Sequence, residues 1–315
     1  MLIINLILFI IACSVLVKSS SLMVRSLSKI SHHLRINEFA IGFIIMAVST
    51  SIPELFVGVT SAIEKNPALA IGTVIGSNIL DLTIIIGIVA LLSRGVKIRS
   101  KIIKKDILYM MAIVLLPVFL MVDREISRMD GLILLGVFVV YIWQLTRQER
   151  KFKRTVDHVK SREAMFYALI ALVGVIILLI SASFVVKFAT LLSIDLVLPP
   201  IFIGLFVISA GTSLPELIFE TKAVISRHEE LALGDLIGSV ITNSTLVLGI
   251  TALIYPISAD LFLFFTSAIF MVLIAFIFMT FAESDKGVSW REGVALIFLY
   301  IFFVIIESYI KMITG

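Results

Sequence analysis

Long apolar runs separated by short polar connections follow one another from one end of the chain to the other. A membrane-spanning helix requires about 20 apolar residues, and the pattern predicts ten such helices. The fourth and fifth runs are the shortest, and the fourth contains Pro117, so a short or tilted hairpin is the alternative there. The predicted runs are residues 1–23, 37–63, 67–93, 107–122, 131–146, 164–192, 197–225, 231–255, 259–282 and 293–313.

Composition and charge favour a membrane protein over a soluble one. Hydrophobic residues make up 60% of the 315 positions and charged residues 15%, whereas about a quarter of the residues in soluble domains are charged. The formal net charge is +4, but the basic residues lie in short connections between apolar runs, which indicates contact with a lipid bilayer and no nucleic-acid partner. The single cysteine, Cys13, excludes an internal disulfide, and the four histidines show no zinc-binding spacing.

The distribution of positive charge predicts an orientation. Most of the 26 Lys and Arg residues fall in the connections that follow the odd-numbered helices. The positive-inside rule places those connections in the cytoplasm. We therefore predict a multi-pass protein of the cell membrane with both termini extracellular and a basic cytoplasmic loop over residues 147–163.

An internal repeat organises the chain. Residues 42–87, the first copy, align without a gap on residues 204–249, the second copy, with identity at roughly a third of the positions. Five crossings separate equivalent points, so the second copy is inverted. We predict an all-α polytopic membrane protein of ten transmembrane helices in two inverted five-helix repeats, residues 1–146 and 164–315. Inverted repeats mark the substrate site of many secondary transporters, and duplication for packing alone is the alternative.

Each copy places a glutamate inside an apolar run, in the motifs STSIPEL and GTSLPEL. A charge at the bilayer centre costs roughly 2.5–3.5 kcal/mol, so such a residue needs a partner. No Lys or Arg lies one helical turn from Glu54 or Glu216, which favours a bound cation or a proton. Pro53 and Pro215 lack an amide hydrogen and are predicted to break each helix, which frees backbone carbonyls.

Further oxygen atoms accompany the glutamates. Calcium prefers oxygen ligands, whereas transition metals favour His or Cys, so this set of side chains predicts a site for a hard cation. Asp81 and its repeat mate Asn243 are favoured over Asp235, whose mate is Thr73. Glu220 and Lys222 have no counterparts, and they are predicted either to pair with each other or to line a cavity. The oxygen-bearing residues are Thr50, Ser51, Thr212 and Ser213 in the motifs, and Thr73, Ser77, Asp81, Asp235, Ser239 and Asn243 at four-residue spacing in the following helices.

These motifs, continued by GTVIGSNILD and GDLIGSVITN, resemble the two alpha-repeats of the sodium/calcium exchangers of the calcium/cation antiporter superfamily, and the prokaryotic members most closely. The resemblance implies four ion sites between helices 2, 3, 7 and 8, with Glu54 and Glu216 as ligands shared by calcium and sodium. It assigns Thr50 and Thr212 to the calcium site; Ala47, Ser51 and Ser77 to one flanking sodium site; and Ser209, Ser213 and Ser239 to the other.

The sequence departs from the familiar pattern of that family. Relatives often carry Asn in the first repeat and Asp in the second at the positions of Asp81 and Asn243, so the pair is exchanged here. Val240 replaces an expected Asn, and Ser209 replaces an Ala that would contribute only its backbone carbonyl. We expect ion binding to survive these changes, with an altered preference between sites.

The resemblance implies a function. It predicts electrogenic antiport of about three sodium ions for one calcium ion by alternating access, with helices 1 and 6 sliding past the binding core. Ca²⁺ and Na⁺ would be transported ions, with no cofactor, no obligatory protein partner and no enzymatic activity. One alternative is a calcium/proton exchanger of the same fold, and a more distant one is an intramembrane acid protease that pairs Asp81 with Asp235 or a glutamate.

Overall fold

The structure, a computed structural model, describes residues 2–34, 46–98, 101–149, 161–196, 199–284 and 287–314. The start of the predicted run 37–63 and most of the predicted loop 147–163 lie outside these residues. The elements are α1 (Leu2–Leu34), α3 (Val48–Thr50), α4 (Ile52–Ile63), α5 (Pro67–Leu80), η2 (Asp81–Ile85), α6 (Ile86–Ser93), α7 (Lys101–Leu120), η3 (Met121–Asp123), β1 (Glu125–Ile126), α8 (Arg128–Glu149), α9 (Ser161–Leu196), α10 (Pro200–Phe202), η4 (Ile203–Ile208), α11 (Ser209–Thr212), α12 (Leu214–Ile225), α13 (Glu229–Thr242), η5 (Asn243–Val247), α14 (Leu248–Ile254), β2 (Ile257–Ser258), α15 (Leu261–Glu283) and α16 (Trp290–Thr314).

The described residues contain six helices that are long and apolar enough to cross a membrane, and a seventh if a bent pair counts as one span. The two shortest predicted runs are among the six, and α7 continues through Pro117. The bent pair joins residues 203–212 to 214–225 at 43°. Within the described residues, the predicted runs 1–23, 37–63 and 164–192 are represented only by shorter apolar helices, Leu2–Val15, Ile52–Ile63 and Met165–Gly174. The six are Pro67–Ser93, Ile103–Asp123, Arg128–Arg147, Glu229–Ile254, Leu261–Glu283 and Trp290–Ile310.

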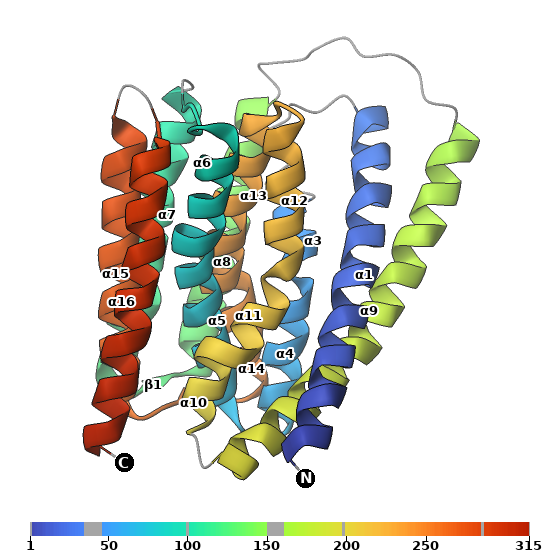
Figure 1. The fold of residues 1–315 in the computed structure, drawn as a ribbon. Coiled ribbons are helices and arrows are strands. Elements are labelled where there is room, and N and C mark those ends of the chain that lie inside the picture. The colour runs from blue at the N-terminus through green and yellow to red at the C-terminus, as the bar shows by residue number, and fades with distance from the viewer. Residues whose placement is uncertain are drawn as a thin grey trace.

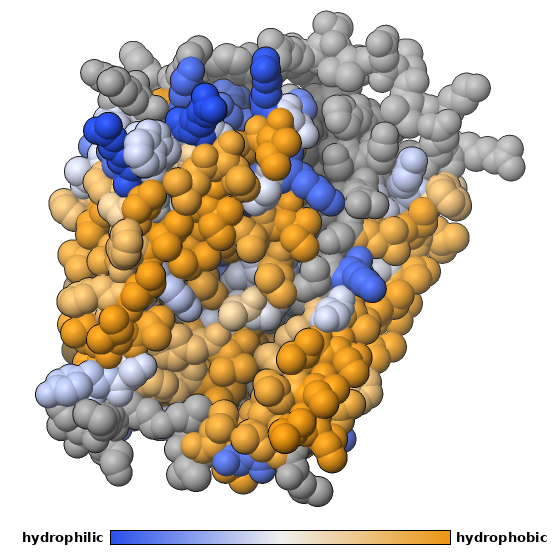
Figure 2. All heavy atoms as spheres, viewed as in Figure 1, coloured by the Kyte–Doolittle hydropathy of each residue, from blue (hydrophilic) through white to orange (hydrophobic). Residues whose placement is uncertain are grey.

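The second helix of each copy forms the middle of the bundle. About four-fifths of the apolar stretch is buried in Pro67–Ser93 (83%) and in Glu229–Ile254 (78%), against 22% in Arg128–Arg147 and in Trp290–Ile310. Figure 1 shows α5 and α13 between the α15–α16 pair on one side and the α1–α9 pair on the other. The central helices therefore contact protein, while the outer ones leave their apolar surface free for lipid, as the orange face in Figure 2 shows.

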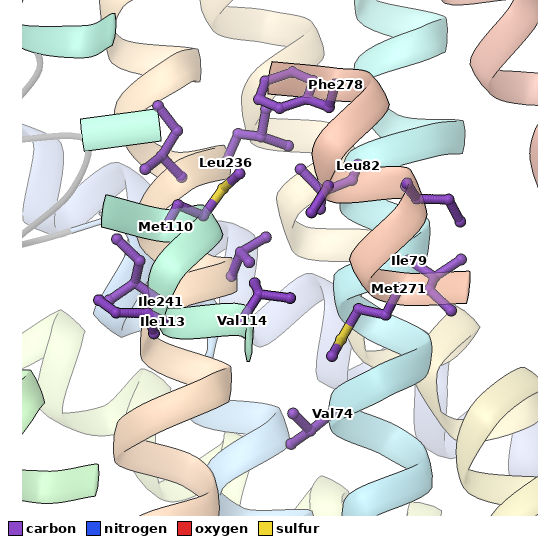
Figure 3. Close-up of a cluster of buried hydrophobic side chains, with 14 of the residues drawn as sticks. Val74, Ile79, Leu82, Met110, Ile113, Val114, Leu236, Ile241, Met271 and Phe278 are labelled. Atoms are coloured by element: carbon purple, nitrogen blue, oxygen red, sulfur yellow. The ribbon is translucent and has the colours of Figure 1, made fainter. Parts of the chain in front are cut away.

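A hydrophobic cluster locks the central helices to the outer ones. Figure 3 shows Ile79 and Leu82 of the α5–η2 helix near Met271 and Phe278 of α15. Phe278 and Leu82 are fully buried. The same cluster includes Met110 and Val114 of α7 and Leu236 of α13. Close van der Waals packing of such side chains holds the central helices against the outer ones along the apolar part of their length.

Glycines allow the two copies to touch backbone to backbone. A Cβ atom at Gly72 would collide with the carbonyl oxygen of Ile201, and one at Gly76 with that of Leu205. Small residues at helix crossings permit this close approach. Helix α5 of the first copy is therefore pressed against α10 and η4, which lead into the helix break of the second copy.

Two short strand pairings join the ends of the bundle, a small addition to the predicted all-α fold. Strands β1 and β2 pair antiparallel, with Glu125 opposite Ser258 and Ile126 opposite Ile257. An isolated antiparallel bridge connects Val96 with Val288. Each pairing links the loop that follows one copy to a loop of the other half of the chain.

Candidate cation-binding site

Both copies contain the same helix break. Helix α3 ends at Thr50 and α4 begins after Ser51, with Pro53 in its first turn. Helix α11 ends at Thr212 and α12 begins after Ser213, with Pro215 in its first turn. Each serine has nearly the same backbone angles, φ −75° and ψ 0° at Ser51 and φ −82° and ψ 3° at Ser213. The break predicted from the prolines is thus present in both copies.

The break brings each glutamate to the start of a helix. Glu54 and Glu216 lie in the first turns of α4 and α12, where the helix dipole favours a carboxylate. Both side chains are 1% exposed. The Oε2 atoms of both glutamates have no hydrogen-bond partner in the part of the chain that the structure describes. An isolated buried carboxylate is costly, so a positively charged occupant between these side chains would stabilise the site.

The hydroxyls of each break reach across to the second helix of the other copy. Thr50 Oγ1 donates to Asp235 Oδ1 at 3.2 Å and lies 3.4 Å from Ser239 Oγ. Ser77 Oγ donates to Glu54 Oε1 at 3.2 Å and lies 3.5 Å from Thr212 Oγ1. The two copies are therefore interlocked at this point, and their oxygen atoms form one continuous polar cluster.

The second helices change their winding at the site. Helices α5 and α13 pass into π-helical segments, η2 and η5, and the first residues of these segments are Asp81 and Asn243. Such π segments are frequent at functional sites. Both oxygens of Asp81 and the Oδ1 atom of Asn243 are buried without a hydrogen-bond partner among the described residues. The sequence pattern gave no indication of this winding.

The Ala47 and Ser209 carbonyls flank the breaks. Ala47 O accepts the amide of Ser51 at 3.0 Å and lies 3.3 Å from the Thr50 hydroxyl, whose one hydrogen is shared with Asp235. Ser209 O accepts the amide of Ser213 at 2.9 Å and the hydroxyl of Thr212 at 3.4 Å. The hydroxyls of Ser51 and Ser213 are buried and unpartnered in the described part of the chain. An ion at either flank would find a free hydroxyl, but it would have to share the carbonyl with these bonds.

All twelve residues predicted for the site are buried, and they come from the breaks and the helices that follow them. They are Ala47, Thr50, Ser51, Glu54, Ser77, Asp81, Ser209, Thr212, Ser213, Glu216, Ser239 and Asn243.

The acidic residues of the site lie on elements that pack against one another. Glu216 lies on α12, Asp235 lies on α13 and Asp81 begins η2, and these three elements pack against one another. Within the described residues, no three acidic, His or Cys side chains converge in the manner of a metal site made of such groups alone. A cation held here would need hydroxyl and carbonyl oxygens besides the carboxylates, which is the composition that the sequence predicts.

Two residues outside the predicted set take part in the cluster. The repeat pattern gives Asp235 less weight because its mate is Thr73, yet Asp235 accepts the hydrogen bond from Thr50. Asn78 donates to Ser244 Oγ at 2.9 Å and accepts from Asn243 Nδ2 at 3.3 Å. The available signal for Asn78 is the mismatch with its repeat mate, Val240, which replaces an expected Asn.

Apolar helices around a buried acidic centre define a multi-pass membrane protein. A family profile described as "Sodium/calcium exchanger protein" matches residues 4–147 and 166–309. The chain therefore belongs to the sodium/calcium exchanger family, whose members are ion transporters. The prediction of a prokaryotic member of the calcium/cation antiporter superfamily is confirmed.

Individual relatives agree with this assignment. "Sodium/calcium exchanger MaX1" of Methanosarcina acetivorans is 28% identical, over 98% of this chain and 100% of the relative. "Putative antiporter CaxA" of Alkalimonas amylolytica is 30% identical, over 76% of this chain and 78% of the relative. A solved structure of the sodium-calcium exchanger NCX_Mj, soaked with Na⁺ and Sr²⁺, superposes with a TM-score of 0.75 at 25% identity and covers 96% of this chain and 98% of that one.

Proposed function

We propose that this protein exchanges sodium for calcium across the cell membrane, about three sodium ions for one calcium ion, by alternating access. The observation that carries the proposal is the pair of Glu54 and Glu216, buried at matching helix breaks with unpartnered oxygens. The family assignment and the names of the relatives support it. The twelve buried residues of the site supply the ligands, with the division between calcium and the flanking sodium sites that the resemblance implies.

The proposed architecture is ten transmembrane helices in two inverted repeats, residues 1–146 and 164–315, joined by a cytoplasmic loop over residues 147–163. Matching breaks and matching π segments in the two copies support it. The Val96–Val288 bridge and the β1–β2 pair occupy equivalent positions in the repeat. In Figure 1 both chain termini lie at the end of the bundle opposite the start of α9, which agrees with termini on one side, proposed to be extracellular.

Coupling follows from competition for the same carboxylates. Glu54 and Glu216 cannot hold a divalent ion and the sodium set together, so one load displaces the other. Empty carboxylates are costly to carry through an apolar barrier, whereas three sodium ions cancel their charge and one calcium ion cancels most of it. The change between outward-facing and inward-facing states is therefore permitted mainly when either load is bound.

Helices α1 and α9 are the proposed moving gate. They pack along each other, and Asn5 Nδ2 donates to Asp195 Oδ2 at 2.8 Å. Helix α1 also touches α3, α11 and α12, the elements around both breaks. A Cβ atom at Gly211 would lie 2.8 Å from Cys13 Sγ. The pair thus lies directly against both breaks, at one side of the bundle (Figure 1).

The proposal is tested by ⁴⁵Ca²⁺ uptake into proteoliposomes with different internal cations. Vesicles loaded with sodium are expected to accumulate calcium, and vesicles loaded with lithium or potassium are expected to do so at a small fraction of that rate. A calcium/proton exchanger remains the second candidate, because the same buried carboxylates bind protons. Uptake driven by a pH gradient at fixed voltage, but not by a sodium gradient, would replace the proposed sodium coupling with proton coupling.

A further inference from the structure

A second buried acid lies one helical turn beyond Glu216 on α12. Glu220 is 0% exposed, and neither of its carboxylate oxygens has a hydrogen-bond partner among the described residues. Lys222, its predicted partner, is exposed, so the ion pair that the sequence allowed is not formed. The charge of Glu220 is therefore left for another group to balance.

The neighbours of Glu220 are themselves acidic. Helix α12 packs against α13, which carries Asp235, and against η2, which begins with Asp81. Asp235 is 0% exposed; its Oδ1 accepts from Thr50, and its Oδ2 has no partner in the described chain. Glu220 and Asp235 thus present three unpartnered carboxylate oxygens on two helices that pack together, and η2, which begins with Asp81, contacts both helices.

The first copy has neither of these carboxylates at the equivalent positions, and side chains of neighbouring helices fill the space there. Gly58 corresponds to Glu220, and a Cβ atom there would collide with the hydroxyl of Thr251. Thr73 corresponds to Asp235, and its hydroxyl donates to the Leu69 carbonyl of its own helix at 2.9 Å. The second copy alone therefore carries two additional negative charges, and they break the pseudo-symmetry of the site.

Neither proposed load supplies charge for this pair. Glu54, Asp81 and Glu216, the central carboxylates, carry up to three negative charges, against which three sodium ions bring three positive charges and one calcium ion brings two. Glu220 and Asp235 add two more in the same buried region. Buried charges are normally paired or coordinate metals, and an all-oxygen carboxylate pair favours a hard cation over a transition metal.

We propose that Glu220 and Asp235 form an additional binding site for a hard cation next to the central carboxylates, joined to the proposed calcium site through the Thr50–Asp235 hydrogen bond. The role of this additional site depends on the proposed exchange function, because a cation bound there would be transported with the exchanged ions or held beside them. Its ligands are the two carboxylates. Asp81, one of the central carboxylates, begins the segment that packs against both helices of the pair, so its charge would couple the two sites.

The test isolates the additional site by removing the central glutamates. Equilibrium binding of ²²Na⁺, ⁸⁶Rb⁺ as a probe for potassium, and ⁴⁵Ca²⁺ is measured on the purified full chain carrying Glu54→Gln and Glu216→Gln. At least one of the three ions is expected to bind still, and Glu220→Gln or Asp235→Asn in that background is expected to weaken it at least tenfold. Glu230→Gln, which removes an exposed carboxylate from α13, is the matched control and should change nothing.

Each outcome decides the proposal. Loss of all cation binding in the Glu54→Gln/Glu216→Gln protein, or residual binding that Glu220→Gln and Asp235→Asn both leave unchanged, would overturn it. Cation-dependent thermal protection of the same variants checks that each is folded and gives a second measure of binding. Sodium-driven calcium uptake by the wild-type protein is read separately, so failure of the additional site and failure of the exchange function are distinguishable.

Discussion

Glu54→Gln and Glu216→Gln are each expected to abolish sodium-dependent calcium transport in both directions. The amide keeps the size of the side chain but removes the charge that both loads require. Replacing a mere partner of a metal ligand costs about 10–100-fold, so loss of a direct ligand is expected to exceed that range. The measurement is ⁴⁵Ca²⁺ flux in proteoliposomes under inward and outward sodium gradients.

The control is Glu64→Gln, which removes an exposed carboxylate just after α4 and should leave the flux unchanged. The two glutamates occupy matching positions in the two breaks, so the two variants should fail alike. Normal sodium-dependent uptake by either one would show that its carboxylate is not a ligand.

Exchanging Asp81 and Asn243 is expected to restore what Asp81→Asn removes. Asp81→Asn deletes one of the central carboxylates, and we expect calcium exchange to fall by about tenfold or more. Adding Asn243→Asp returns a carboxylate at the equivalent position, the first residue of η5. Asn78, which now accepts from Asn243, carries an amide that can turn to donate to the new carboxylate.

The half-saturation of exchange for external calcium is the quantity to measure in this pair. The double variant is expected to approach the wild-type value, with a changed balance between calcium and sodium affinity. Asn243→Asp alone serves as the comparison, because it adds a charge without removing one. A double variant as inactive as Asp81→Asn would show that the two positions are not interchangeable.

The chemistry of the helix breaks is predictable from the sequence because it depends on local rules. A proline lacks the amide hydrogen that a helix interior needs, so Pro53 and Pro215 by themselves indicate where each helix breaks. A glutamate one residue later, repeated in both copies, identifies the acidic group. These features involve residues that are adjacent in the chain.

The connections between copies are not predictable in the same way. The hydrogen bond from Thr50 to Asp235 joins residues 185 positions apart, and the repeat alignment points away from it because Asp235 matches Thr73. The π segments that begin at Asp81 and Asn243 depend on packing that periodicity does not report. The two copies differ at Glu220 and Gly58, and the repeat alignment therefore predicts no role for Glu220.

The central claim is that calcium and sodium compete for one set of buried oxygens between the two copies. Equilibrium ⁴⁵Ca²⁺ binding to the purified protein, titrated with sodium at constant ionic strength, tests it directly. The account predicts that sodium displaces calcium completely, with a steeper than hyperbolic dependence because more than one sodium ion enters. Calcium binding that persists at saturating sodium, while sodium is shown to be bound, would contradict it.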